Sequence, residues 1–111
     1  MKKAEIWMGN LNPSQGSKQA GFRPLLIVSG NLLNTHSPVV WVCPLTSKIK
    51  NYKGDLILNP NKKNGLTQQS EVLAMHFRSI SKSRLIEKLG TIEANQLAEL
   101  RKSLNEIMEL D

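Results

Sequence analysis

The chain has 111 residues, a length that predicts one domain with an ordinary hydrophobic core. Its 40% hydrophobic and 22% charged residues exclude a disordered or collagen-like chain. One cysteine excludes a disulfide scaffold, and no apolar run approaches the roughly 20 residues of a membrane span. We therefore expect a single-domain protein of the reducing cytoplasm that has no membrane partner.

Positive charge fills most of the chain, and negative charge gathers at its end. Residues 1–90 contain 13 basic and 4 acidic side chains, a formal charge of +9, whereas residues 91–111 contain 2 and 5, a charge of −3. A basic body favours a polyanion, either nucleic acid or an acidic protein segment, although it is also compatible with an ordinary soluble surface. Aromatic residues make up only 5% of the chain, so nucleic acid would be recognised through charge and hydrogen bonds rather than by stacking several bases.

Six short segments are predicted as strands, because they are apolar or β-branched and are bounded by Gly, Pro, Asn and Ser. A polar loop over 12–21 separates the first two, residues 30–34 form a turn or one helical turn, and 59–65 form a dense turn cluster. Gly90 lies inside the last segment and predicts a bulge or a close backbone approach. The predicted strands cover residues 4–11, 24–29, 39–45, 55–58, 71–80 and 84–92.

The apolar period changes after the last predicted strand. Apolar residues then recur mostly at steps of three and four, the period of one amphipathic helix, at Ala94, Leu97, Leu100, Leu104, Ile107 and Met108. Strands followed by one terminal helix predict a mainly β protein, a small and strongly bent antiparallel sheet or barrel with the helix packed against it. We place the barrel at about residues 1–92 and the helix at about 93–109.

The sequence contains no recognisable metal or nucleotide motif. His36, His76 and Cys43 have no ligand-like spacing, and neither a phosphate-cradling glycine loop nor a nucleophile elbow is present. Cys43 lies in an apolar run, where a thiol is buried and inert unless a cationic neighbour activates it as a nucleophile. We therefore expect no cofactor, and the candidate functional residues are polar side chains at the ends of apolar strands.

Three such positions could carry chemistry. Arg23 precedes a buried strand and is suited to a bidentate phosphate contact, unless it forms an ordinary salt bridge. Thr46 and Ser47 end a strand and could hold a phosphate together with the lysines that follow, although hydroxyl groups also cap turns. Strand alternation places His76 and Arg78 on one face, where a histidine is often structural.

The order of these residues resembles the MazF/PemK family of toxin endoribonucleases. Glu5-Ile6-Trp7, then Asn12-Pro13, then Gly16–Pro24 are similar to that family's G-[ED]-[IV]-[WY]…[DN]-P…G-x-E-Q-x-G-x-R-P signature, with Ala4 in place of its first glycine. The similarity extends to about residue 108, through Leu25–Ser29, Pro44–Ser47, Gly65-Leu66, Ser70–Ile80, Ser83–Leu85 and Leu89-Gly90.

The resemblance implies an SH3-like β-barrel with a C-terminal helix, acting as a homodimer. It implies metal-independent, sequence-specific cleavage of single-stranded RNA, in which a 2′-hydroxyl attacks the adjacent phosphate and leaves a 2′,3′-cyclic phosphate and a 5′-hydroxyl. It also implies a small acidic antitoxin of the MazE type, through which alone the toxin would contact operator DNA. The alternatives are a non-catalytic member that binds an acidic antitoxin or nucleic acid, and a gyrase inhibitor of the related CcdB-type fold.

The same resemblance assigns catalytic roles. Arg23 matches the family's catalytic arginine and would stabilise the pentavalent phosphorane or also transfer a proton; the electrostatic role is favoured because a guanidinium ordinarily stays charged. Thr46 matches the catalytic threonine and would donate a hydrogen bond to a phosphoryl oxygen, and Ser47 matches a hydroxyl position near the RNA.

The chain departs from the family at two places where carboxylates are usual. Lys18 replaces a glutamate, and Met75 and His76 replace an acidic residue and a glutamine. His76 could act as general base or acid, since imidazoles ordinarily titrate near neutral pH, or it could contact RNA or be structural. Lys18 is expected to contact phosphate. The residues expected to bind RNA are Lys18, Gln19, Ser47, Lys48, Lys50 and Arg78.

Overall fold

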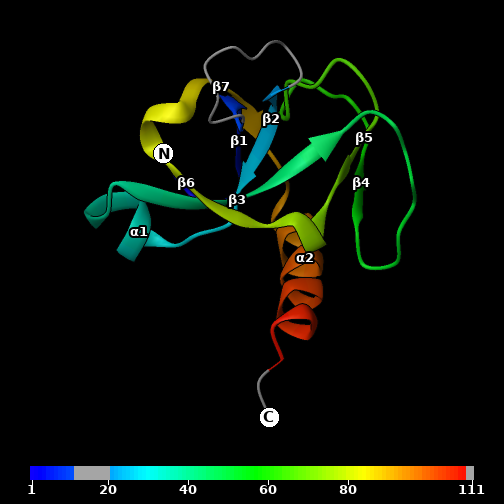
Figure 1. Cartoon of the computed structure of the whole chain (residues 1–111). Coiled ribbons are helices and arrows are strands. Elements are labelled where there is room, and N and C mark those ends of the chain that lie inside the picture. Colours follow the sequence, from blue (N-terminus) through cyan, green and yellow to red (C-terminus); the bar gives the residue numbers. More distant parts are fainter. Residues whose placement is uncertain (12–20, 110–111) are drawn as a thin grey trace.

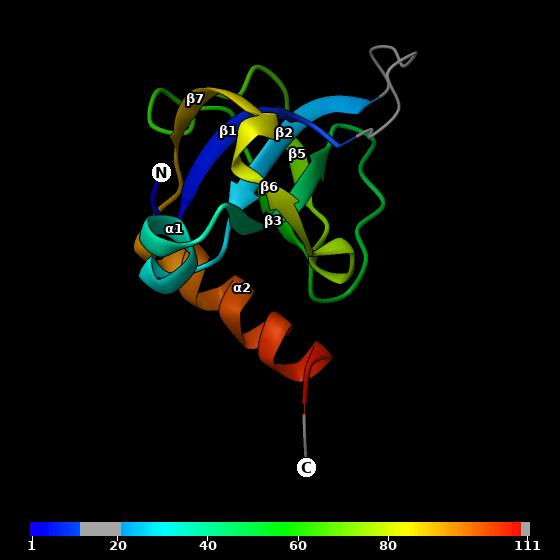
Figure 2. The same cartoon turned by 60° about the vertical axis from the view of Figure 1, so that its left-hand side comes forward.

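The computed structural model describes residues 1–11 and 21–109, and in this part of the chain seven strands form one antiparallel sheet. The strands are β1 (Glu5–Asn10), β2 (Phe22–Ile27), β3 (Val39–Thr46), β4 (Leu56–Leu58), β5 (Ser70–Val72), β6 (Arg78–Ser81) and β7 (Leu85–Thr91). Their order is β4-β5-β3-β2-β1-β7, and β6 pairs with β3 outside that path. The strongly bent sheet is a half-barrel with the helix α2 (Ala94–Ile107) beneath it, as Figures 1 and 2 show, which confirms the expected mainly β fold with a terminal helix.

The terminal helix begins where the change of period predicts. Glu93 and Gln96 form a capping box at its start, in which the Glu93 N–H donates to Gln96 Oε1 at 2.8 Å. Leu100 and Leu104 are buried against the sheet, but Ile107 and Met108 at the end of the apolar stripe are exposed by 44% and 37%. The helix is therefore held by its first three turns.

The two faces of the sheet carry separate apolar clusters. Leu26 of β2 joins the cluster that contains Leu100 and Leu104 of α2, whereas Leu25 and Ile27 join the cluster on the opposite face. This division follows from the alternation of side chains along a strand. The continuous apolar run over 24–29 is thus explained by a strand that is buried on both faces.

The strand predicted over 24–29 lies two residues earlier in the chain, since β2 spans Phe22–Ile27. Ser29 lies outside the ladder, and its carbonyl accepts a hydrogen bond from Asn34 Nδ2 at 2.7 Å. Asn34 belongs to α1 (Asn31–His36), the helical turn expected after Gly30.

The prediction of one continuous strand over 71–80 is wrong. The segment forms β5, a 3₁₀ turn η2 (Ala74–His76) and β6. Both strands pair with one edge of β3, where Val72 lies opposite Leu45 and Arg78 lies opposite Val42. Five residues therefore separate Val72 from Arg78, whereas two separate Val42 from Leu45, and the extra residues form η2. Pro44 explains the interruption, because it has no N–H for this edge and offers only its carbonyl, which accepts from Leu73 N at 2.9 Å.

The shared strand face predicted for His76 and Arg78 is therefore also wrong. His76 is an exposed residue of η2, and Arg78 opens β6 after the chain has turned. A further 3₁₀ turn, η3 (Lys82–Arg84), shortens the last predicted strand at its start.

Gly65 and Gly90 mark a close approach between the loop after β4 and strand β7, as predicted for Gly90. A Cβ at Gly65 would lie 2.1 Å from the Leu89 carbonyl oxygen, and a Cβ at Gly90 would lie 2.2 Å from that of Lys63. Gly65 also has a φ of +69°, a conformation that side chains rarely adopt. The two glycines thus let the 59–65 turn cluster pack directly against the backbone of β7.

Glu5 and Trp7, which open the family signature, form a buried structural contact. Glu5 Oε1 accepts hydrogen bonds from Trp7 Nε1 and from the Lys2 N–H, both at 2.9 Å, and Lys88 Nζ lies 3.2 Å from Glu5 Oε2. Burial raises the pKa of Glu5, but the contacts with Trp7, Lys2 and Lys88 outweigh burial and lower it. Glu5 therefore joins the N-terminal segment, β1 and β7.

Candidate active site

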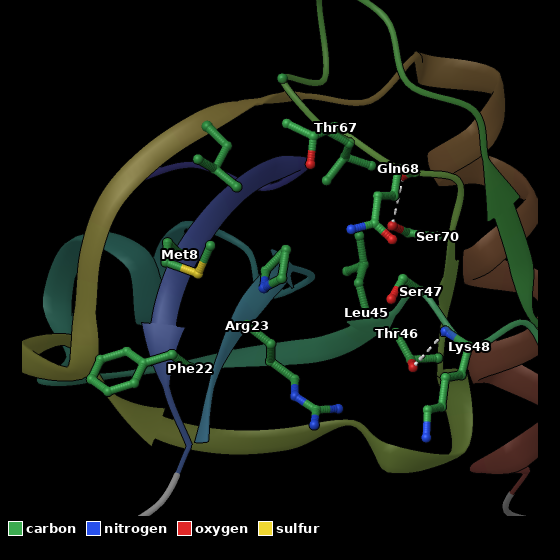
Figure 3. Close-up of a pocket in the computed structure, with 14 residues that line it drawn as sticks. Met8, Phe22, Arg23, Leu45, Thr46, Ser47, Lys48, Thr67, Gln68 and Ser70 are labelled. Carbon is green, nitrogen blue, oxygen red and sulfur yellow. Dashed lines mark hydrogen bonds between the residues drawn. The ribbon is translucent and has the colours of Figure 1, made fainter. Parts of the chain in front are cut away.

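A cavity of about 620 Å³ lies where β2 and β3 separate at one end of the sheet. Figure 3 shows Arg23 from β2 and Thr46 and Lys48 from the end of β3 on the same side of this pocket. Its other wall comes from the segment between β4 and β5 and from β7. The lining residues are Met8, Phe22, Arg23, Pro24, Leu45, Thr46, Ser47, Lys48, Gly65, Leu66, Thr67, Gln68, Ser70 and Leu89.

The pairing of β2 with β3 explains why Arg23 and Thr46 line the same pocket. The ladder between these strands ends at the pair Leu25 and Pro44. Continuing the same antiparallel register by two residues places Arg23 opposite Thr46. Beyond Pro44, however, β3 pairs on its other edge with β5, where Thr46 lies opposite Glu71. The strands part between Arg23 and Thr46, and the pocket occupies that opening.

The Thr46 hydroxyl is oriented by the chain that follows it. Thr46 Oγ1 accepts a hydrogen bond from the Lys48 N–H at 3.1 Å, which Figure 3 shows as a dashed line. Because a hydroxyl has one donor and two acceptor positions, the Thr46 O–H can still donate to a ligand. The same contact holds Lys48 at the edge of the pocket.

The pocket is electrostatically suited to an anion. Among the described residues that line it, Arg23 and Lys48 are the cations, and none of them carries a carboxylate or an imidazole. Arg23 is half-buried, and hydroxyl and amide groups of Thr46, Ser47 and Gln68 surround the opening. A guanidinium with converging hydroxyl donors is the arrangement that binds phosphate.

The structure brings four of the predicted site residues together, namely Arg23, Thr46, Ser47 and Lys48. Lys50, His76 and Arg78 are exposed and do not line the pocket. Lys18 and Gln19 lie outside the described residues.

The far wall of the pocket contains residues that were not predicted from the sequence. Thr67 and Gln68 follow the Gly65-Leu66 motif, and Ser70 starts β5, where its Oγ donates to the Gln68 carbonyl at 3.0 Å. Phe22, which directly precedes Arg23, also lines the pocket and is 44% exposed. The available signal was the position of an aromatic residue directly before Arg23 in the signature.

The carboxyl groups of Glu71 and Asp55 form a pair beside the segment that follows Thr46. The Glu71 carboxylate is fully buried and accepts the backbone N–H groups of Lys50 and Asn51 at 2.6 and 2.7 Å on Oε1 and of Tyr52 at 3.0 Å on Oε2. Burial raises the pKa of Glu71, but a hydrogen bond from Asp55 and these three N–H groups outweigh burial and lower it to about 2.

Asp55 is the member of this pair that keeps its proton to the higher pH. Burial and the adjacent Glu71 raise the pKa of Asp55 to about 6, against the Ala74 N–H and the charge of His76, which lower it. Asp55 Oδ1 accepts the Ala74 N–H at 2.9 Å, whereas Oδ2 is buried and accepts no hydrogen bond from the described residues. An oxygen in that position suits a proton that is donated to Glu71.

Cys43 is buried in the cluster beneath the sheet, as expected for an inert thiol. Burial, with a contribution from the charge of Asp55, raises the pKa of Cys43 to about 12, so a thiolate nucleophile is disfavoured there. Within the described ranges, no three His, Cys, Asp or Glu side chains are arranged to hold a metal ion. The helices of the described part are too short or too polar to cross a membrane.

The bent sheet, the terminal helix and the pocket with its arginine and threonine define a small half-barrel protein with a site for an anionic ligand. Residues 2–108 match the family model of the PemK-like, MazF-like toxins of type II toxin–antitoxin systems. The chain therefore belongs to the PemK/MazF toxin family.

Individual relatives agree with this assignment. The chain is 30% identical to the Endoribonuclease MazF of Staphylococcus saprophyticus, over 95% of this chain and 88% of that protein. It is similar to the crystal structure of MazF from Deinococcus radiodurans, with a TM-score of 0.81, 30% identity and coverage of 99% of this chain and 97% of that one. A MazE–MazF complex from the same organism matches with a TM-score of 0.77, 27% identity and coverage of 100% and 97%.

The carboxyl pair predicts a pH-dependent stability. Because the pKa of Asp55 is raised in the folded state, the stability that its proton contributes is complete below the ordinary carboxyl pKa and is lost as the pH rises through about 6. Asp55→Asn keeps an N–H donor toward Glu71 at every pH. We expect the free energy of unfolding of the wild type to fall, relative to that of Asp55→Asn, by about 2 kcal/mol between about pH 4 and about pH 7.5. Urea unfolding at both pH values measures this difference, and parallel pH profiles of the two proteins would contradict it.

Proposed function

We propose that the protein is a toxin endoribonuclease that cleaves single-stranded RNA at the pocket formed by Arg23 and Thr46. The observation that carries the proposal is the convergence of a half-buried guanidinium, a donor hydroxyl and Lys48 at one opening. The related protein named Endoribonuclease MazF supports the same activity. The charge of +9 over residues 1–90 supports attraction of a polyanion to the surface that carries this pocket.

The proposed reaction is an internal transfer at phosphorus that uses no cofactor or metal. The ribose 2′-oxygen forms a bond to the adjacent phosphorus as the bond to the 5′-oxygen breaks, giving a 2′,3′-cyclic phosphate and a 5′-hydroxyl. The 2′-hydroxyl loses a proton, and the leaving 5′-oxygen gains one. Arg23 stabilises the charge that grows on the phosphorane oxygens, and Thr46 donates a hydrogen bond to one of them.

The remaining pocket residues are proposed to bind the RNA around the reacting phosphate. Ser47 and Lys48 lie next to Thr46 and would contact the neighbouring phosphates. The exposed ring of Phe22 offers a surface for stacking one base, a contact that adds affinity for any sequence. Lys18, Gln19, Lys50 and Arg78 are proposed to extend this contact beyond the pocket.

His76 is proposed to contact RNA rather than to transfer a proton. It is exposed in η2 and lies outside the lining of the pocket, and Ala74 and Met75 of the same turn line a second cavity beside α2. A proton-transfer group must lie within hydrogen-bond reach of the reacting oxygens, either directly or through one water.

We further propose that the protein forms a homodimer in the cytoplasm and is neutralised by a small acidic antitoxin of the MazE type. The structures of MazE–MazF complexes from Deinococcus radiodurans support a partner of this kind. An acidic, flexible segment would compete with RNA for the basic body of the toxin. Operator DNA would be contacted through the antitoxin alone.

Removal of the Arg23 guanidinium tests the proposed reaction. We expect Arg23→Ala to fold normally and to lower the single-turnover rate of RNA cleavage by roughly 10²–10³, the loss of about 3–4 kcal/mol of transition-state stabilisation. Thr46→Val should act in the same direction but less severely. Cleavage in EDTA, with detection of cyclic-phosphate ends, is the measurement. Arg101→Ala removes the same group from the exposed side of α2 and serves as the control. Tight RNA binding without cleavage by the wild type would favour a non-catalytic member.

Substitution of His76 tests its assignment as an RNA contact. His76→Gln should change KM or the preferred sequence and leave the pH dependence of the cleavage step as in the wild type. Single-turnover rates across a pH series make this comparison. A His76→Gln protein that lost the pH dependence would restore His76 as the general acid or base.

The proposed homodimer predicts a mass of twice the 12.4 kDa chain in solution. Two copies are expected because one small half-barrel offers little surface for several nucleotides. Sedimentation equilibrium at micromolar concentration measures the mass directly. A 12.4 kDa species over the whole concentration range would contradict the proposal.

A further inference from the structure

The side chain of Glu71 connects the pocket to a buried anchor. The backbone of Glu71 lies opposite Thr46 in the sheet, and its carboxylate binds the N–H groups of Lys50, Asn51 and Tyr52. The segment that carries Ser47 and Lys48 into the pocket therefore runs between Thr46 and this carboxylate. We propose that Glu71 is a positioning residue of the RNA site, which holds Lys48 in place for a phosphate. This inference rests on the proposed endoribonuclease function.

The anchor fixes the segment at two points. At its start, Thr46 Oγ1 accepts the Lys48 N–H. Two residues later, three successive N–H groups converge on one carboxylate, and Asn51 among them has a φ of +57°. Successive N–H groups with one residue in the left-handed region form a concave binding site for an anion. In this protein the anion is its own Glu71.

The charge of Glu71 is taken up by backbone groups and not by lysine side chains. In the described part of the chain, the ion pairs are Lys63 with Glu93 and Lys88 with Glu5. Lys48 and Lys50 therefore keep their ammonium groups available, although they flank a segment that is tied to a carboxylate. The arrangement orders the backbone without neutralising the cations that would meet RNA.

A neutral side chain cannot replace this carboxylate. Its two oxygens accept three backbone N–H groups. In Glu71→Gln, one oxygen becomes an NH₂ group that faces a donor, and at least one backbone N–H is left without an acceptor. The β5 ladder to Leu45 and Thr46 is made by backbone groups and is retained.

The test compares Glu71→Gln with the wild type and with Val72→Ala. Val72 is the next residue of β5 and is fully buried in the cluster beneath the sheet, so its truncation lowers stability without removing the carboxylate that binds the three N–H groups. We expect amide exchange at Lys50, Asn51 and Tyr52 to become faster in Glu71→Gln but not in Val72→Ala. With a short RNA substrate, KM should rise on the order of tenfold in Glu71→Gln, with kcat within about twofold.

Two further readouts separate positioning from a structural role. Loss of one phosphate contact should reduce the slope of log affinity against log salt by about 0.7 for single-stranded RNA. If Glu71 acts through Lys48, adding Lys48→Ala to Glu71→Gln should leave KM where Lys48→Ala alone places it. The proposal would be overturned if the double variant raised KM by the product of the two single factors. An unchanged KM in Glu71→Gln despite faster amide exchange would also overturn it. If Glu71→Gln does not fold, Glu71→Asp keeps the charge on a side chain one methylene shorter, and the same outcomes apply to it.

The wild type separates this inference from the function on which it rests. If the wild type does not cleave RNA while its purified form is folded, the endoribonuclease function fails, and the RNA role of Glu71 fails with it. If the wild type cleaves RNA and Arg23→Ala does not, but Glu71→Gln retains the wild-type KM, the function stands and the role of Glu71 alone is overturned.

Discussion

Strand β3 has to pair with three other strands, and the rest of the structure depends on how it does so. Its one edge meets β2 up to Pro44, while its other edge meets first β6 and then β5. Pro44 cannot donate to that second edge, so the partner segment is displaced there as η2. Beyond Pro44, β3 leaves β2 and follows β5, and the separation opens the pocket between Arg23 and Thr46.

The same crossing of strands explains why the carboxyl pair lies beside the segment that follows Thr46. Glu71 stands opposite Thr46, and Asp55 binds the N–H of Ala74 at the start of η2. The pair therefore joins the segment after Thr46, the strand β5 and the displaced turn. Burial and the adjacent Glu71 raise the pKa of Asp55 to about 6, whereas the hydrogen bonds that Glu71 accepts hold its own pKa low.

The residues of the family signature serve two separate physical purposes. Glu5, Trp7 and Gly90 build the sheet, through a buried carboxylate and a close backbone contact. Arg23 and Thr46 contribute little to the core and instead place polar groups at an opening. Acidic residues gather in the terminal segment that contains α2, while the charged residues among the described pocket lining, Arg23 and Lys48, are cations. This separation of charge leaves the basic body available to an RNA or to an acidic antitoxin.

The sequence by itself determined the mainly β fold and the terminal helix, because the apolar period is a local property of the chain. The order of its motifs also singled out Arg23 and Thr46, which the structure places in one pocket. The sequence also indicated the close approach at Gly90. It did not predict the break between β5 and β6, since alternation within 71–80 carries no information on which edge of β3 each half must meet. Tertiary structure alone decided that His76 leaves the strand, that Thr67 and Gln68 reach the pocket, and that Glu71 is buried with its charge. Each of these depends on which segments pack together across long separations in sequence, and a buried carboxylate is stable only where folding brings it enough hydrogen-bond donors.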